Sequence, residues 1–262
     1  IWSATYHPTK AEPDEYQAIF SPHEAEFRRR DGDISTHTRV SISPDHNMEM
    51  RKITFTNHSN IVKQLQVTSY IEVVNDYHRA EISHPAFSKL FIESEFLPEE
   101  SLFLSKRRGC GDEDGPLPLI MHMVKDCGKS FEQAGYENDR LKFIGRNNTV
   151  QNPDAIVEDI SLSSQSGFSA DPIMSLRAEI TLEPGEITSL CFIIGVCDSR
   201  EEAIKISNEL IPYRIDDLFE KARLQSGMEL KYLNISRRQV NAFQDIISPL
   251  FYPCRHYRGP SE

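Results

Sequence analysis

A stretch around residue 87 combines a histidine, an aromatic ring and a lysine in the order His84-Pro85-Ala86-Phe87-Ser88-Lys89-Leu90-Phe91. Pro85 fixes its own φ angle and restricts His84, which predicts a stiff loop that enters a strand. A ring such as Phe87 can stack on a sugar, while His84 and Lys89 can donate hydrogen bonds to hydroxyl or phosphate oxygens. The alternative interpretation is that Phe87 belongs to the core and Lys89 lies in solvent.

The single tryptophan, Trp2, lies close to Tyr6 and Pro8 in the sequence. Its indole ring could stack against a sugar face, or it could fill the edge of the core, and the sequence leaves both interpretations open. The candidate substrate-binding residues are therefore Trp2, Tyr6, His84, Phe87 and Lys89.

Titratable residues are numerous, but their spacing selects no catalytic set. His78 and His84 lie near Asp76 and Glu72 in the sequence and could form a small polar cluster, although ordinary surface histidines are the simpler interpretation. Sugar epimerisation needs a histidine and a carboxylate across one pocket, and His84 with Glu72 is the pairing to consider. Glycoside cleavage needs two carboxylates across a cleft, and spacing cannot choose such a pair here. We assign no catalytic residue.

Sequence motifs for metals and cofactors are also missing. The chain contains no GxSxG, no HExxH and no paired-cysteine metal site. The Gly-rich run from Gly109 to Gly115 carries three acidic residues and precedes Pro116, which excludes a dinucleotide fingerprint. Met123 occupies the position where a calcium loop would place its last glutamate, so a surface loop is expected. We predict no metal and no cofactor.

Charge and hydropathy exclude two classes of binding partner, nucleic acids and membranes. The formal charge is −11, which would repel a polyanion, and Asp31 and Asp33 follow the one basic run, 28–30, at once. That run is expected to be a solvated strand end, and nucleic acid is an unsuitable partner. No apolar run approaches the roughly 18 residues of a membrane span, so no direct membrane contact is predicted. The chain has five cysteines, an odd number, and no CxxC motif. Cys191 and Cys197 fall in an apolar strand and are expected to be core thiols.

The first two thirds of the chain have the period of β-strands. Asp31-Gly32 is a hairpin signal between segments 25–30 and 34–42, and the segment 48–56 follows after a Ser-Pro-Asp turn. Together with a candidate strand at 16–20, these predict an antiparallel meander. A longer alternating segment, 65–73, predicts one half-buried strand. Segments 173–182 and 187–196, joined by Glu-Pro-Gly-Glu, predict a second hairpin.

The period changes near Ser199. Ser199 with Glu202, and Ser236 with Gln239, have the spacing of capping boxes, and amphipathic stripes follow both. Pro212 is expected to stop the first helix, and Pro249 and Pro253 to break the third. We therefore predict a mainly β domain over residues 1–198 and a helical segment over 199–262. The complete apolar face of the third helix predicts that the chain is part of a larger protein.

Several motifs in one order carry a family resemblance. They are Ile1 to Tyr6, Ala25 to Gly32, Thr68 to Val74, His84 to Phe91, Asp171 to Arg177, and the tail from Leu233 to Pro253. Together they resemble the β-supersandwich domain of glycoside hydrolase family 94, formerly glycosyltransferase family 36, and most of all the domain of cyclic β-1,2-glucan synthetases.

The resemblance implies a galactose-mutarotase-like β-supersandwich followed by a short α-helical linker toward an α/α barrel. The larger protein would make or phosphorolyse β-glucan, in the cytoplasm or at the cytoplasmic face of the inner membrane. The family's catalytic acid and phosphate site lie in the barrel, so no catalytic residue is carried over to this chain. The domain would brace the barrel, meet glucan or glucosyl oligosaccharides through the larger enzyme, and take part in a homodimer. Two other functions stay open: a stand-alone carbohydrate-binding module and a mutarotase-type sugar epimerase.

Overall fold

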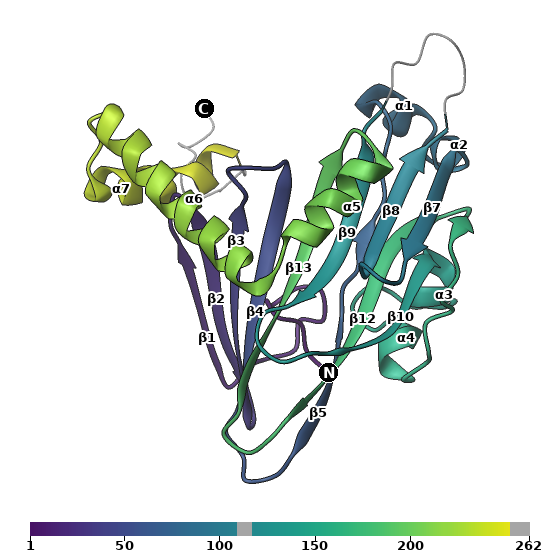
Figure 1. Ribbon diagram of the computed structural model, residues 1–262, viewed down its shortest axis with the longest axis horizontal. Helices are drawn as coiled ribbons and strands as arrows, with labels where there is room; N and C mark the ends of the chain where they lie inside the picture. Colours follow the sequence, from purple (N-terminus) through teal and green to yellow (C-terminus); the bar gives the residue numbers. More distant parts are fainter. Residues whose placement is uncertain (109–116, 252–262) are drawn as a thin grey trace, which may run out of the picture.

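The computed structural model of the chain describes residues 1–108 and 117–251, apart from the side chains at positions 237, 248 and 249. Two β-sheets and a group of helices make up this part (Figure 1). The prediction of a mainly β fold followed by helices is confirmed. The predicted loop at 109–115 lies outside the described residues.

The larger sheet has nine strands, and all of its pairings are antiparallel. In spatial order they are β1 (Glu15–Phe20), β2 (Glu24–Asp31), β3 (Ile34–Ile42), β4 (Met48–Asn57), β13 (Ile187–Cys197), β9 (Leu119–Asp126), β8 (Leu102–Arg107), β7 (Ile92–Leu97) and β11 (Gly167–Phe168). The smaller sheet contains β10 (Glu132–Asp139), β12 (Pro172–Leu182) and β5 (Lys63–Thr68), with β6 (Ile71–Glu72) also paired to β12.

The described helices fall in three parts of the chain. They are α1 (His78–Ser83), α2 (Pro85–Lys89), α3 (Arg140–Ile144), α4 (Asp154–Val157), α5 (Arg200–Glu209), α6 (Pro212–Tyr232) and α7 (Arg237–Phe251). The change of period after Ser199 is confirmed, because Ser199 is the N-cap of α5. Pro212 begins α6, as a proline at the first helical position can. The prediction that Pro249 breaks the third helix is wrong: α7 continues to Phe251, since the missing N–H removes only one bond near its end.

The predicted meander is confirmed as β1 to β4, which are neighbours in chain order. Ile34, Thr36 and Thr38 alternate with less buried residues along β3. The hairpin loop is shifted by one residue from the prediction. Asp31 pairs with Ile34, so the loop residues are Gly32 and Asp33, and Gly32 takes the left-handed backbone with φ 58°.

The predicted second hairpin is wrong. The two segments are the strands β12 and β13, but β12 lies in the smaller sheet and β13 in the larger, so their connecting turn carries the chain between layers. Both strands are buried along most of their length, which fits central strands of two packed sheets. The single strand predicted at 65–73 is two shorter strands, β5 and β6, which both pair with β12.

The core has two main parts, one on each side of the larger sheet. Between the sheets lie buried residues such as Phe103, Leu176 and Leu190. On the other face, the helices α5 and α6 cover a second cluster that contains Met50, Met123, Ile193, Ile206 and Leu218. The layers therefore run from helices through the larger sheet to the smaller sheet (Figure 1). Cys191 and Cys197 are free thiols in the helix-side cluster, as their apolar strand predicts.

The prediction that the basic run 28–30 is solvated is wrong at Arg29. Its side chain is buried, and Nε and Nη2 donate to the Asp31 carboxylate at 2.6 and 2.7 Å. Nη2 also donates to the backbone oxygen of Ala11 at 2.8 Å, and Nη1 to that of Thr5 at 3.4 Å. A buried guanidinium needs such partners, and here they tie the N-terminal segment to β2.

Candidate functional site

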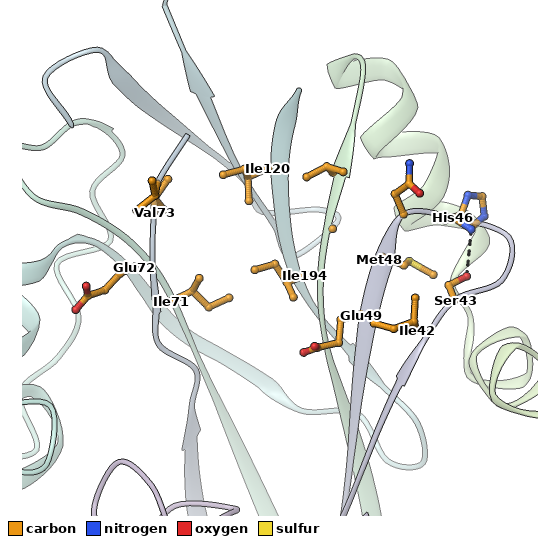
Figure 2. Close-up of a pocket in the computed structure, with 14 residues that line it drawn as sticks. Ile42, Ser43, His46, Met48, Glu49, Ile71, Glu72, Val73, Ile120 and Ile194 are labelled. Carbon is orange, nitrogen blue, oxygen red and sulfur yellow. Dashed lines mark hydrogen bonds between the residues drawn. The ribbon is translucent and has the colours of Figure 1, made fainter. Parts of the chain in front are cut away.

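A groove of about 510 Å³ opens between the two sheets, at one end of the central strands of the larger sheet (Figure 2). Ile71 and Val73 form one wall, Ile194 and Ile120 lie in the centre, and the turn between β3 and β4 forms the other wall. Four segments far apart in sequence build this hollow: the β3–β4 turn, the strand β6, the start of β9 and the end of β13. No local motif marks it, so sequence reasoning missed it.

The groove is aliphatic rather than aromatic. Among the described residues that line it there is no Phe, Tyr or Trp ring on which a sugar could stack. Gly195 fixes its shape, because a Cβ atom there would lie 2.7 Å from Met48 Cβ and from Met121 Cε. A lining of Ile, Val and Met fits apolar side chains from another protein segment better than it fits a hydroxylated ligand.

Glu72, on the rim of the groove, is already engaged. Tyr70 Oη donates to Glu72 Oε1 at 2.7 Å, and Arg140 Nε donates to the same oxygen at 2.9 Å. The Tyr70 hydrogen bond, together with Arg140, lowers the pKa of Glu72. Within the described residues no hydrogen bond or ion pair joins Glu72 to His84, which lies exposed between α1 and α2. A carboxylate held ionised in this way is a poor general acid.

A second hollow of about 240 Å³ continues from the first around His46 and Asn47. Asp198, Glu202 and Cys197 contribute to its wall. In the part of the chain that the structure describes, no group of three or more His, Cys, Asp or Glu side chains is arranged to hold a metal ion.

The predicted stiff loop at 84–91 is instead helical, with Pro85 at the first position of α2. Phe87 is 59% exposed, so it is not a core residue. Its ring stands edge-on to the Phe91 ring, with the two centroids 5.1 Å apart. Lys89 is not free in solvent either, because its Nζ lies 2.6 Å from Asp171 Oδ1.

The N-terminal candidates occupy another region. Trp2 is half-buried and packs against the core between the sheets, whereas Tyr6 is exposed beside the His7 ring. In Figure 1 the N-terminus and α2 lie far apart, so the structure does not bring the five candidate residues into one site. Their role in sugar binding stays a prediction.

The most exposed apolar feature of the helical segment is one face of α7. The side chains on it are Phe243 at 53% exposure, Ile246 at 50%, Ile247 at 49%, Leu250 at 73% and Phe251 at 77%. Of the apolar stripe predicted from the sequence, Val240 alone is buried in the described part. None of the described helices is both long and apolar enough to cross a membrane.

Three proteins of known name are similar to this chain. The cyclic beta-(1,2)-glucan synthase NdvB of Rhizobium meliloti (strain 1021) is 28% identical over 267 residues, which covers 100% of this chain and 9% of that protein. The solabiose phosphorylase of Paenibacillus borealis is 22% identical over 84% of this chain and 28% of its own length. A 3-O-beta-D-glucopyranosyl-beta-D-glucuronide phosphorylase of the same organism is 23% identical over 80% of this chain and 26% of its own length.

The chain thus spans less than a third of each of these relatives. The family model described as "Glycosyl hydrolase 94, supersandwich domain" matches residues 1–211. That match includes both sheets and the helix α5. It confirms the resemblance carried by the sequence motifs, and this chain belongs to the glycosyl hydrolase 94 supersandwich domain family.

Proposed function

We propose that this chain is a non-catalytic supersandwich domain that braces the catalytic part of a longer enzyme, and that the enzyme makes or phosphorolyses β-glucan. The names of the three relatives support the reaction class, and their greater lengths support a further catalytic region. The division at residues 198 and 199, the homodimer, and a location in the cytoplasm or at the cytoplasmic face of the inner membrane belong to this proposal as predictions.

The exposed apolar face of α7 carries the proposal. Five large apolar side chains at 49% exposure or more lie on one short helix. Full burial of a single Phe, Ile or Leu side chain is worth about 1.5–3 kcal/mol, so a partner surface would stabilise this helix strongly. We take the catalytic region of the longer enzyme as that partner, because α7 lies after the family domain in the chain, separated from it by α6.

The aliphatic groove supports the same interpretation. A volume of about 510 Å³ is sufficient for several aliphatic side chains, and its centre is formed by Ile120 and Ile194. The groove lacks the aromatic platform expected of a sugar site within the described residues. The surface of the domain is therefore better suited to protein contacts than to catalysis.

Substitutions on α7 in the longer enzyme test the proposal. We expect Phe243→Ser combined with Ile247→Asn to lower glucan synthesis or phosphorolysis by ~10-fold or more, because the loss of two buried contacts exceeds ~1.4 kcal/mol. The same pair of changes in the isolated chain should leave its melting temperature unchanged, since both side chains are half exposed there.

Asn241→Ser, an exposed polar position on the same helix, is the matched control and should leave activity unchanged. Full activity of the double variant in the longer enzyme would overturn the bracing role. Efficient phosphorolysis or transfer by the isolated chain would overturn the non-catalytic assignment.

A carbohydrate-binding module is the second candidate, and the exposure of Phe87 favours it. Calorimetric titration of the chain with β-1,2-linked glucose oligomers distinguishes the two functions. Binding at millimolar sugar that is lost in Phe87→Ala, and retained in Phe168→Ala, would support the module. Phe168 is the matched control because its ring is also more than half exposed. We expect no binding.

A further inference from the structure

The short strand β6 leaves an edge of the smaller sheet open beside the groove. In the described part of the chain β6 pairs only with β12. Just before and just after it, Ser69 N and Val73 N donate to backbone oxygens of β12 at 2.9 and 3.2 Å. Because bonded positions alternate along an antiparallel ladder, positions 69, 71 and 73 face β12. The N–H and C=O groups of Tyr70, Glu72 and Val74 therefore point away from it.

These outward groups are available for pairing. Within residues 1–108 and 117–251, no hydrogen bond from another element reaches the main chain of Tyr70, Glu72 or Val74. The segment 69–74 contains no proline and no lysine, and Val74 is 49% exposed. A free, partly apolar sheet edge of this kind is a template for a further strand.

A strand on this edge would lie over the groove. Ile71 and Val73 line the groove from the side of the open edge, and Ile120 and Ile194 form its floor (Figure 2). Ile42, 61% exposed, lies at the opposite wall. The larger sheet thus extends past the smaller sheet here, and its inner face is left uncovered. Successive side chains of a strand alternate between faces, so every second side chain of an added strand would enter the groove.

We propose that the groove receives a β-strand from the catalytic region of the longer enzyme, which extends the smaller sheet along Tyr70, Glu72 and Val74. The inference rests on the proposed function and names where a part of that region docks. Backbone hydrogen bonds to the open edge would fix the strand in place. Its inward side chains would be aliphatic, because the groove is lined by Ile, Val and Met side chains.

A segment of the same polypeptide suits this site better than a separate protein. The open edge offers the main-chain groups of only three residues, and few aliphatic side chains can enter the groove beside it. So small a contact gives a separate protein little surplus over the cost of association. Within one polypeptide the high effective concentration reduces that cost. The three relatives have most of their length outside the region that this chain matches, which leaves ample chain for such a strand.

Hydrogen exchange over 70–74 tests the pairing. In the isolated chain the amides of Tyr70, Glu72 and Val74 should exchange rapidly, whereas those of Ile71 and Val73 are protected by β12 and supply the reference. In the longer enzyme we expect the three outward amides to slow by about 10-fold or more. No slowing in the longer enzyme would overturn the proposal.

Val74→Pro tests the open edge. Proline removes one outward N–H, so Tyr70 and Glu72 should return to rapid exchange in the longer enzyme. Val74→Thr keeps the N–H and the branched shape, so it is the matched control and should retain the slow exchange. The isolated Val74→Pro chain should keep its melting temperature, since that N–H has no partner in the described part of the chain. Slow exchange that survives Val74→Pro would overturn the pairing.

Ile194→Trp tests the groove. Ile194 is only partly buried on the groove floor, so the isolated chain should accommodate the larger ring without loss of melting temperature. In the longer enzyme the indole would occupy the space of the inserted side chains, and the slow exchange over 70–74 should be lost. Ile194→Val leaves that space open and is the matched control. Slow exchange in the Ile194→Trp enzyme would overturn the groove as the docking place.

Photo-cross-linking from benzoylphenylalanine in place of Val74 identifies the occupant. We expect a cross-link in the purified longer enzyme to one peptide outside residues 1–262. A cross-link only within residues 1–262, or protection of 70–74 that grows with the concentration of the isolated chain, would overturn the proposal. The proposed function is tested separately at α7. Lost activity in the Phe243→Ser, Ile247→Asn variant, with unchanged exchange over 70–74, would keep the bracing role and reject this strand.

Discussion

His122 joins the two sheets as a buried, neutral side chain. Its Nδ1 lies 2.9 Å from the backbone oxygen of Ile193, and Nε2 lies 2.7 Å from Ser69 Oγ, next to the smaller sheet. Burial lowers the pKa of His122 from 6.5 to about 4. The imidazole is therefore uncharged in the folded protein at neutral pH, and protonation would place an unpaired charge between the layers.

This burial predicts a loss of stability in mild acid. Between about pH 6.5 and pH 4, His122 is protonated in the unfolded chain but stays neutral in the folded chain. The free energy of unfolding therefore falls as the pH drops through this range. The loss attributable to His122 reaches at most about 3 kcal/mol. Denaturant unfolding at pH 7.0 and pH 4.5 measures it. His122→Gln should flatten the dependence, whereas exposed His78→Gln should not; equal slopes in both variants would refute the argument.

Substitution by alanine is predicted to have opposite effects on stability at Gly195 and Gly227. A Cβ atom at Gly195 would meet Met48, Met121 and the Asn47 oxygen at 2.7–2.8 Å, so Gly195→Ala should destabilise the fold by about 1–3 kcal/mol. Nothing lies within 4 Å of a Cβ at Gly227 in α6, so Gly227→Ala should stabilise it by about 0.5–1 kcal/mol. Thermal melts give both values. Changes of the same sign would contradict the close packing at Gly195.

Single residues were the hardest features to predict from the sequence. Arg29 looks like a solvated strand end, but two backbone oxygens of the N-terminal segment and one carboxylate accept its protons. Likewise, the side chain of Lys89 reaches Asp171, 82 positions away. Both contacts join residues distant in sequence, and no local pattern encodes such a partner.

At the scale of elements, the starts of α5 and α7 were predictable because capping is local. Ser199 Oγ accepts from Glu202 N at 3.1 Å, although the Glu202 carboxylate reaches back to Asp198 N, one residue earlier than in a standard capping box. At α7, Ser236 N donates to Gln239 Oε1 at 2.9 Å. The strands β1 to β4, β12 and β13 were predictable from local alternation and turn residues, whereas the segment 65–73 is two strands rather than one. The partners of β5, β12 and β13 were not predictable, because periodicity identifies a strand but not its neighbour.

The two caps should differ in their effect on the whole domain. Ser199→Ala should lower the free energy of unfolding by about 1 kcal/mol, because α5 is fastened to the core through Ala203 and Ile206. Ser236→Ala should leave global stability unchanged and only increase fraying of α7, which buries Val240 alone among its described apolar side chains. Urea unfolding and far-ultraviolet circular dichroism separate the two effects. A global loss in Ser236→Ala would mean that α7 is packed on the domain.

At the scale of the whole molecule, a layered β-domain carries two apolar surfaces that residues 1–108 and 117–251 leave open. The groove lies between the sheets, and the face of α7 lies on the last described helix. The sequence predicted the α7 face through its stripe but not the groove, since the groove is built from four distant segments. Together with the length of the relatives, these surfaces are the basis for a bracing role.

Hydrogen exchange of the α7 backbone amides tests the central claim most directly. In the isolated chain these amides should exchange rapidly, because α7 has little tertiary support. In the longer enzyme the account predicts slowing by about 10-fold or more, the effect of at least ~1.4 kcal/mol of packing on the catalytic region. The amides of β13, buried in both forms, supply the internal reference. Equal exchange of α7 in the isolated chain and in the longer enzyme would contradict the account.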